Sequence, residues 1–282
     1  MQLPYFSAFE SVPDQYRQRL MPEAMPQYLQ SALSPQGIII CLHGFTGMPY
    51  EVLPVAKACV ASGFDAAVPL LPGHGYAALT DQRQWFPRIT MEQMHEVARA
   101  EIERARQQYE FVGMFGLSMG GAIALTMASE GRLDACVAAA PALRLPDIAE
   151  RLIPILGWAN FFIRKRKKPE FYLPCYPFYN SWALRELRRM GRYATDQLPK
   201  VTCPLCVVHS HQDPTISPAV VDMILQHVPQ SVDVEWFDES GHCLPCDIQG
   251  QAMAEYSARF FQQIAGCNQE IRPEHLIQPG DT

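Results

Sequence analysis

The chain has 282 residues, of which 48% are hydrophobic, and it carries a formal net charge of −6. That length suits one large domain with an insertion, or two modest domains. The acidic balance argues against general nucleic-acid binding, which requires a basic face. No stretch approaches the roughly 20 apolar residues of a membrane span. The first residues, Met1 to Tyr5, lack a basic start followed by an apolar run, so we expect no signal peptide.

Nine cysteines form an odd set. This usage favours reduced thiols in a cytoplasmic protein over a disulfide scaffold. Two pairs, at 203–206 and 243–246, have CxxC spacing, which leaves a zinc site or a redox couple as an alternative. We favour small buried apolar side chains, because Cys206 falls in an expected buried strand.

In chain order, apolar runs alternate with amphipathic periods. Residues 1–36 are mostly polar, and we expect an irregular leader there. Strands are expected over residues 37–42, 64–70, 111–115, 135–140, 205–209 and 232–237. Helices are expected from about residue 50 and over residues 91–109, 118–130, 218–227 and 248–264. This alternation predicts an α/β fold with a mostly parallel sheet flanked by helices.

One segment, residues 143–195, breaks the alternation and is rich in aromatic and basic residues. Helices are expected over 147–163 and 181–190, the second with Ser181 as N-cap and Gly191 as its stop. We expect a small helical cap over the end of the sheet where an active site lies. The expected parts are a core of residues 1–142 and 196–282, and a cap of residues 143–195.

A basic run, Arg-Lys-Arg-Lys-Lys at 164–168, stands out in this acidic chain. It follows a markedly apolar segment, residues 152–163. A charge run is most often a solvated face. Apolar surface beside basic surface also suits peripheral contact with anionic lipid, or with an acidic substrate. Both interpretations stay open at this point.

Residues 116–120 read Gly-Leu-Ser-Met-Gly between an expected strand and an expected helix. A nucleophile elbow requires this context, in which the turn lifts Ser118 Oγ clear of the sheet. Glycine on both sides lets neighbouring segments approach without a Cβ clash. An ordinary glycine-rich turn between a strand and a helix could have the same five residues. Other residues must therefore distinguish a nucleophile elbow from such a turn.

A serine hydroxyl needs a base to take its proton and an acid to orient that base. His242 follows the expected strand 232–237, and Asp213 follows the expected strand 205–209. Both residues therefore fall at carboxyl ends of strands, where parallel sheets place their chemistry. Asp147 follows an earlier strand and stays an alternative acid.

An oxyanion hole requires two backbone N–H groups aimed at the developing alkoxide. We expect one from Met119, directly after Ser118. The other is expected from Phe45 in the 43–47 loop, His-Gly-Phe-Thr-Gly, where glycines let the backbone turn inward.

The other histidines receive structural interpretations. We expect His43 and His74 to hydrogen-bond their own glycine loops. His209 and His211 lack partners at ligand spacing, so we expect no metal site.

Three motifs, His-Gly-Phe-Thr-Gly, Gly-Leu-Ser-Met-Gly-Gly and Ser-Gly-His, occur in this order and resemble the α/β-hydrolase superfamily. Within it, the chain is most similar to small carboxylesterases and monoacylglycerol lipases, over residues 37–264. The Pro-Gly-His-Gly segment at 72–75 matches a structural loop of that group. The roles that the resemblance implies are nucleophile for Ser118, acid for Asp213, base for His242, and oxyanion donors for the amides of Phe45 and Met119.

These features predict a serine hydrolase that cleaves carboxylic esters with an apolar acyl group through an acyl-enzyme, without a cofactor. A thioesterase or acyltransferase would use the same three residues and stays an alternative. A non-catalytic ligand-binding pseudo-hydrolase and an enzyme that cleaves carbon–carbon bonds are further alternatives. Serine at the elbow disfavours dehalogenase and epoxide hydrolase chemistry, which needs a carboxylate there. The substrate, its acyl length and the oligomeric state stay open.

Overall fold

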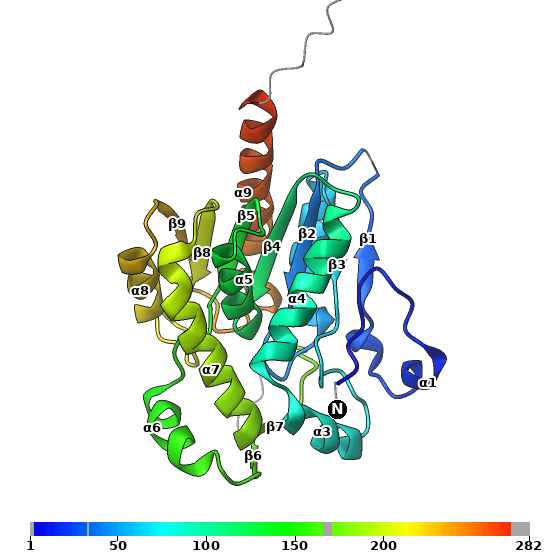
Figure 1. Cartoon of the computed structure of the whole chain (residues 1–282), viewed down its shortest axis with the longest axis vertical. Coiled ribbons are helices and arrows are strands. Elements are labelled where there is room, and N and C mark those ends of the chain that lie inside the picture. Colours follow the sequence, from blue (N-terminus) through cyan, green and yellow to red (C-terminus); the bar gives the residue numbers. More distant parts are fainter. Residues whose placement is uncertain (1–2, 33, 166–170, 272–282) are drawn as a thin grey trace, which may run out of the picture.

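A computed structural model describes residues 3–32, 34–165 and 171–271 of the chain. Its central sheet is built from β1 (Gln27–Leu29), β2 (Ile38–Leu42), β3 (Asp65–Val68), β4 (Val112–Leu117), β5 (Ala135–Ala139), β8 (Leu205–His209) and β9 (Val232–Trp236). The spatial order is β1-β3-β2-β4-β5-β8-β9 (Figure 1). Every neighbouring pair is parallel except β1 with β3. The predicted mostly parallel sheet is confirmed.

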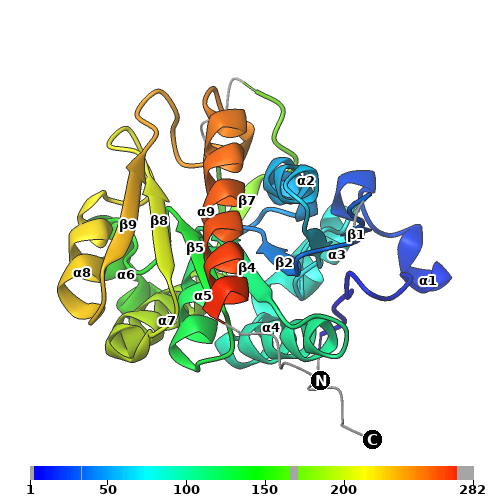
Figure 2. The ribbon, with the colours of Figure 1, turned by 90° about the horizontal axis from the view of Figure 1, so that it is seen from above.

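Helices cover both faces of this sheet (Figure 2). One face carries α2 (Leu53–Ala61) and α9 (Gly250–Ile271), which contact each other. The other carries α4 (Met91–Arg106), α5 (Met119–Ser129), α7 (Ser181–Gln197) and α8 (Ala219–His227), with α5 in contact with both α4 and α7. Each face has its own apolar cluster, so the inner strands β2 to β5 and β8 are buried along their whole length.

The region before β2 differs from its expectation as an irregular leader. It contains the short helix α1 (Asp14–Arg17), and β1 extends the sheet by pairing antiparallel with β3. A further short helix, α3 (Leu79–Trp85), follows β3. Three residues of half-buried strand give too short an alternation to be recognised from sequence. No described helix is long and apolar enough to cross a bilayer.

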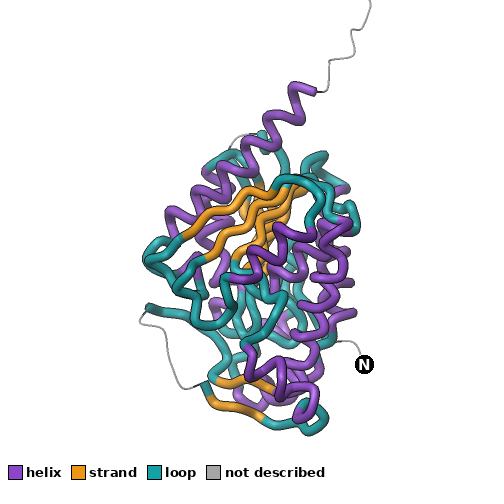
Figure 3. The backbone as a smooth tube through the Cα atoms, turned by 90° about the vertical axis from the view of Figure 1, so that its left-hand side faces the viewer, coloured by secondary structure: helices purple, strands orange, loops and turns teal. Residues whose placement is uncertain are grey.

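Between β5 and β8 the chain forms α6 (Asp147–Leu156), β6 (Phe162–Arg164), β7 (Phe178–Asn180) and then α7. The antiparallel β6–β7 pair stands apart from the main sheet (Figure 3). The expected helix over 147–163 was wrong in its second half. Pro154 removes an amide donor inside α6, and Gly157 closes it by donating to Ile153 O at 2.8 Å. Beyond it, Phe161 N–H bonds to Ser181 Oγ at 3.0 Å and leaves the helical path.

The next helix, α7, begins at Ser181 as expected, but its expected N-cap and its expected end were wrong. Asn180, not Ser181, is the N-cap of α7, and its side chain accepts from the amides of Trp182 and Ala183 at 3.0 and 3.1 Å. The helix also runs through Gly191. A Cβ at that position would lie 2.4 Å from Ala142 O, so this glycine permits close packing instead of ending the helix.

Candidate active site

Ser118 occupies the sharp turn between β4 and α5, with φ 55° and ψ −108°. This conformation is costly for a residue with a side chain and persists only where the surroundings hold it. Here the end of β5 and the residues after it do so. Ser118 N–H donates to Ala139 O at 2.8 Å, and Ser118 O accepts from Ala142 N–H at 2.9 Å.

The glycines on either side of Ser118 are required by close backbone approach. A Cβ on Gly116 would lie 2.1 Å from Gly120 O, and a Cβ on Gly120 would lie 2.3 Å from Leu42 O. Both distances are far below van der Waals contact, so β2, β4 and α5 could not meet at this turn with larger residues.

His242 bridges two residues that are remote in sequence. Its Nε2 lies 2.9 Å from Ser118 Oγ, and its Nδ1 lies 2.7 Å from Asp213 Oδ2. The Asp213 side chain is fully buried, whereas that of His242 is 16% exposed. When Nδ1–H donates to the carboxylate, the lone pair of Nε2 faces the serine hydroxyl. This geometry can transfer the hydroxyl proton to the imidazole.

The Asp213 carboxylate is held in the ionised form. Its Oδ1 accepts from the amides of Thr215 and Ile216 at 2.7 and 2.9 Å. Burial acts to raise the pKa of Asp213, but His242 and these two amides outweigh it and lower the pKa below its usual value. The alternative acid, Asp147, is exposed and accepts from Arg144 instead.

Two backbone amides adjoin Ser118. Met119 is the first residue of α5, so its N–H has no intrahelical acceptor. Across the turn lies the 43–47 loop, where a Cβ on Gly44 would be 3.5 Å from Ser118 Cβ. The Phe45 N–H of this loop donates to no group among the described residues. Two amide donors without protein acceptors thus belong to the segments that meet at the serine.

His43 and His74 hold loops as buried neutral side chains. His43 Nδ1 donates to Gly44 O at 3.0 Å, and its Nε2 accepts from Leu71 N–H at 3.1 Å. His74 Nδ1 donates to Pro72 O at 2.8 Å. Burial lowers the pKa of His43 well below its usual value and that of His74 to about 4. The hydrogen bonds described for these two rings go to backbone groups and not to Ser118.

The other candidate metal ligands are dispersed. His211 is exposed, stacks on Trp236 with ring centroids 3.7 Å apart, and bonds to Asp238. All nine cysteines are free thiols, and Cys203 and Cys206 are buried. Among the described residues, no group of three or more His, Cys, Asp or Glu side chains is arranged to hold a metal ion.

Two charged residues contact the 43–47 loop, a role that the sequence did not indicate for either. Glu51 lies in the short 3₁₀ helix η2 (Pro49–Val52), and its Oε2 accepts from Gly44 N–H at 2.9 Å. Lys165 Nζ donates to Thr46 Oγ1 at 2.6 Å. The only signal for Glu51 is a single acid at the start of an apolar helix. Lys165 belongs to the basic run, of which residues 166–168 lie outside the described residues.

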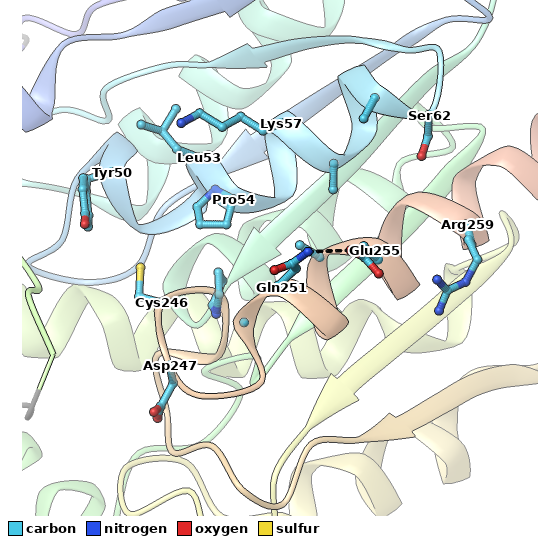
Figure 4. Close-up of a pocket in the computed structure, with 15 residues that line it drawn as sticks. Tyr50, Leu53, Pro54, Lys57, Ser62, Cys246, Asp247, Gln251, Glu255 and Arg259 are labelled. Carbon is cyan, nitrogen blue, oxygen red and sulfur yellow. Dashed lines mark hydrogen bonds between the residues drawn. The ribbon is translucent and has the colours of Figure 1, made fainter.

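A separate groove of about 810 Å³ runs between α2 and α9, beside the short 3₁₀ helix η5 (Leu244–Cys246) (Figure 4). Lys57 and Gln251 line it from the two helices. Of the described residues that line it, none is Ser118, Asp213 or His242. The chemistry-bearing side chains therefore gather elsewhere, at the carboxyl ends of β4, β8 and β9.

Residues 39–256 match the profile of the alpha/beta hydrolase family. The chain belongs to this family. It is 26% identical over 253 residues to a thermostable monoacylglycerol lipase from Bacillus sp. (strain H-257), covering 86% of this chain and 96% of that protein. It is 20% identical to a carboxylesterase from Bacillus subtilis (strain 168), over 80% of this chain and 92% of that enzyme.

Solved structures agree on the fold of this α/β-hydrolase. A structure described for the metagenome-derived lipolytic enzymes LipS and LipT superimposes with a TM-score of 0.79 at 23% identity, covering 87% of this chain and 100% of that one. A soluble variant of monoglyceride lipase from Saccharomyces cerevisiae gives a TM-score of 0.70 at 11% identity, over 85% of this chain and 91% of that one. At these identities the likeness concerns architecture.

Proposed function

We propose that this α/β-hydrolase cleaves carboxylic esters through an acyl-enzyme on Ser118. The observation that carries the proposal is the position of His242, within hydrogen-bond distance of both Ser118 Oγ and the buried Asp213 carboxylate. The similarity to a monoacylglycerol lipase and a carboxylesterase supports an ester as substrate.

In the proposed mechanism, Ser118 Oγ attacks the ester carbonyl carbon while His242 Nε2 takes the hydroxyl proton. Asp213 stabilises the resulting imidazolium and keeps its orientation. The tetrahedral oxyanion accepts hydrogen bonds from the amides of Phe45 and Met119. His242 then gives its proton to the leaving alkoxide, which departs as an alcohol. Water, deprotonated by His242, attacks the acyl-enzyme and releases the acid and free Ser118. No step requires a cofactor.

We further propose that residues 143–195 act as the cap and supply an apolar acyl site. Aromatic rings of this segment reach the 43–47 loop. The Tyr179 ring stacks beside Phe45 at 6.4 Å between centroids, and the ring of Phe86, from the core, lies 5.0 Å from Phe45. Tyr176 and Phe178 extend the same cluster from Phe86. Phe86, Tyr176 and Phe178 are buried, whereas Phe45 and Tyr179 are half-buried. The accessible parts of these two rings favour an apolar acyl chain over a charged one.

The experiment compares wild type with Ser118→Ala on p-nitrophenyl esters of increasing acyl length, together with fluorophosphonate labelling. We expect labelling and turnover in wild type, and loss of both in folded Ser118→Ala. Full esterase activity in the variant would refute the assignment. Faster turnover of matched thioesters, or acyl transfer to an added alcohol in place of hydrolysis, would favour the thioesterase or the acyltransferase.

We also propose that α6 contacts a lipid surface. Ile148, Ile155 and Trp158 are 74%, 71% and 81% exposed, and the neighbouring Arg144 and Arg151 are exposed as well. Apolar side chains flanked by cations suit the interface of an anionic bilayer.

Sedimentation with vesicles tests the contact of α6 with lipid. A double variant, Ile148→Ser with Ile155→Ser, should bind anionic phosphatidylglycerol vesicles less than wild type, because it removes apolar area without altering charge. The control is Leu225→Ser on α8, which removes another exposed apolar side chain. Equal sedimentation of all three proteins would contradict the proposal.

A further inference from the structure

The backbone of the 43–47 loop is held by hydrogen bonds on nearly every side of Phe45. The peptide that carries the Phe45 N–H has Gly44 O as its carbonyl oxygen. That oxygen accepts from His43 Nδ1 at 3.0 Å and from Gly47 N–H at 3.2 Å. Because a trans peptide is planar, fixing its carbonyl fixes the opposite direction of the Phe45 N–H. The orientation of this amide therefore depends on the groups that hold its neighbours.

Glu51 holds the loop from inside the protein. Its Oε2 accepts from Gly44 N–H, and its carboxyl group fills the space where a side chain at position 47 would stand. A Cβ on Gly47 would lie 2.0 Å from Glu51 Oε2 and 2.2 Å from Glu51 Cδ. Glu51 is only 4% exposed. Burial of a carboxyl group is costly, so a packing role alone would be met better by an apolar residue.

Lys165 holds the same loop from the segment proposed as the cap. Its Nζ donates to Thr46 Oγ1 at 2.6 Å and lies 5.0 Å from the centre of the Tyr179 ring. Tyr176 N–H donates to Thr46 O at 2.9 Å. Thr46 itself has φ 64°, a left-handed conformation that a β-branched residue adopts only when held. Lys165 and Tyr176 supply that restraint from outside the core.

The charges around Glu51 connect these two contacts. Lys165 and His242 both lie near enough to favour its ionised form, and the thiols of Cys243 and Cys246 are also close to it. Cys246 Sγ also donates to Glu51 O at 3.5 Å, which joins η5 to η2. A carboxyl group inside the loop and an ammonium group outside it thus act on one five-residue segment.

We propose that Glu51 and Lys165 are positioning residues that together aim the Phe45 amide at the oxyanion. This inference rests on the proposed ester hydrolysis. Neither side chain contacts the reacting atoms. Glu51 acts through Gly44 N–H, in the peptide next to the one that carries the Phe45 amide, and Lys165 acts through Thr46. Loss of either contact lets the loop rotate. The amide then binds the transition state less well while substrate affinity changes little, because the oxyanion forms only after attack.

The first test compares Glu51→Leu with Glu51→Gln by kcat and KM on one p-nitrophenyl ester. Leucine fills the space but cannot accept from Gly44, so kcat should fall about tenfold to a hundredfold with KM within about threefold. Glutamine keeps an acceptor and should restore kcat to within about threefold of wild type. The control is Glu101→Leu, at another buried glutamate that accepts a backbone amide, that of Ala8, away from the site.

The second test uses Lys165→Met, with Lys57→Met at an exposed lysine of α2 as control. Lys165→Met should lower kcat about tenfold with KM within about twofold, and should slow fluorophosphonate labelling in proportion, because phosphonylation uses the same oxyanion donors. Lys57→Met should leave both unchanged. This arm keeps the inference testable if Glu51→Leu fails to fold.

The outcomes separate this inference from the function on which it rests. If wild type is neither labelled nor active on esters, the proposed function fails. If wild type is active and Lys165→Met keeps wild-type kcat, the inference alone fails. Three results with folded Glu51→Leu would also overturn the inference. Its kcat could equal that of wild type, Glu101→Leu could lower kcat by the same factor, or Glu51→Gln could fail to restore kcat.

Discussion

The buried carboxyl group of Glu51 should make the stability of this protein fall as pH rises. Burial raises the pKa of Glu51 from its usual 4.5 to about 7, against the opposing effects of the Gly44 amide, Lys165 and His242. Between these two values the folded protein keeps a proton that the unfolded chain has lost. The stabilisation is therefore complete below pH 4.5 and is lost as pH rises through about 7.

The size of the effect follows from the same two values. The interval between 4.5 and about 7, at roughly 1.4 kcal/mol for each pH unit, corresponds to about 3.5 kcal/mol of unfolding free energy. Glutamine has the same shape and no charge at any pH. Wild type should thus lose about 2 to 3 kcal/mol relative to Glu51→Gln between about pH 5 and pH 8.5.

Urea unfolding of both proteins at the two pH values, followed by tryptophan fluorescence, measures this difference. The same measurement on Glu239→Gln sets the baseline for removing an exposed carboxyl group. The decisive quantity is how the gap between wild type and Glu51→Gln changes with pH. A gap that stays constant within about 0.5 kcal/mol would refute the account of Glu51 as a buried carboxyl that takes up a proton near neutral pH.

Further predictions concern the proposed catalytic acid and the packing of α7. Asp213→Asn should lower kcat by a factor on the order of 10³ to 10⁴, because the imidazole loses the carboxylate that orients it. Asp147→Asn should keep wild-type turnover. The reverse result would favour Asp147 as the acid. Folding lowers the pKa of Asp213, so this carboxylate should stabilise the protein at pH values above its unfolded-state pKa. That stabilisation should be lost as pH falls through the folded-state pKa. Unfolding of wild type and Asp213→Asn over a series of acidic pH values measures this loss. Gly191→Ala, which places a Cβ 2.4 Å from Ala142 O, should lower the thermal midpoint despite the better helix propensity of alanine; an unchanged or higher midpoint would contradict the tight packing of α7.

Local pattern was enough for the features that depend on near neighbours in the chain. A run of buried β-branched residues predicts β2 because a strand covered on both faces must be apolar throughout. The apolar residues of α4 recur at steps of three and four, which predicts a helix because one of its faces must meet the core. The glycines around Ser118 predict a sharp turn since no other residue fits there. Such signals led to the fold class and to the candidate nucleophile, base and acid.

Where the local signal was ambiguous, contacts between remote segments decided. From sequence alone, a glycine that ends a helix looks the same as Gly191, which lies inside one. The close approach of Ala142 O shows that this glycine is required for packing within α7. The choice between Ser181 and Asn180 as N-cap depended on Phe161, which takes up the serine hydroxyl.

The order of motifs along the chain was sufficient to nominate Ser118, Asp213 and His242, because strand ends in a parallel sheet meet at one edge. Which carboxylate faces the imidazole required the fold, since Asp213 and Asp147 both follow strands. The contacts that Glu51 and Lys165 make with the 43–47 loop could be identified only from the tertiary structure. A buried charge leaves no periodic trace in sequence, and its partners lie on segments that only tertiary packing brings together.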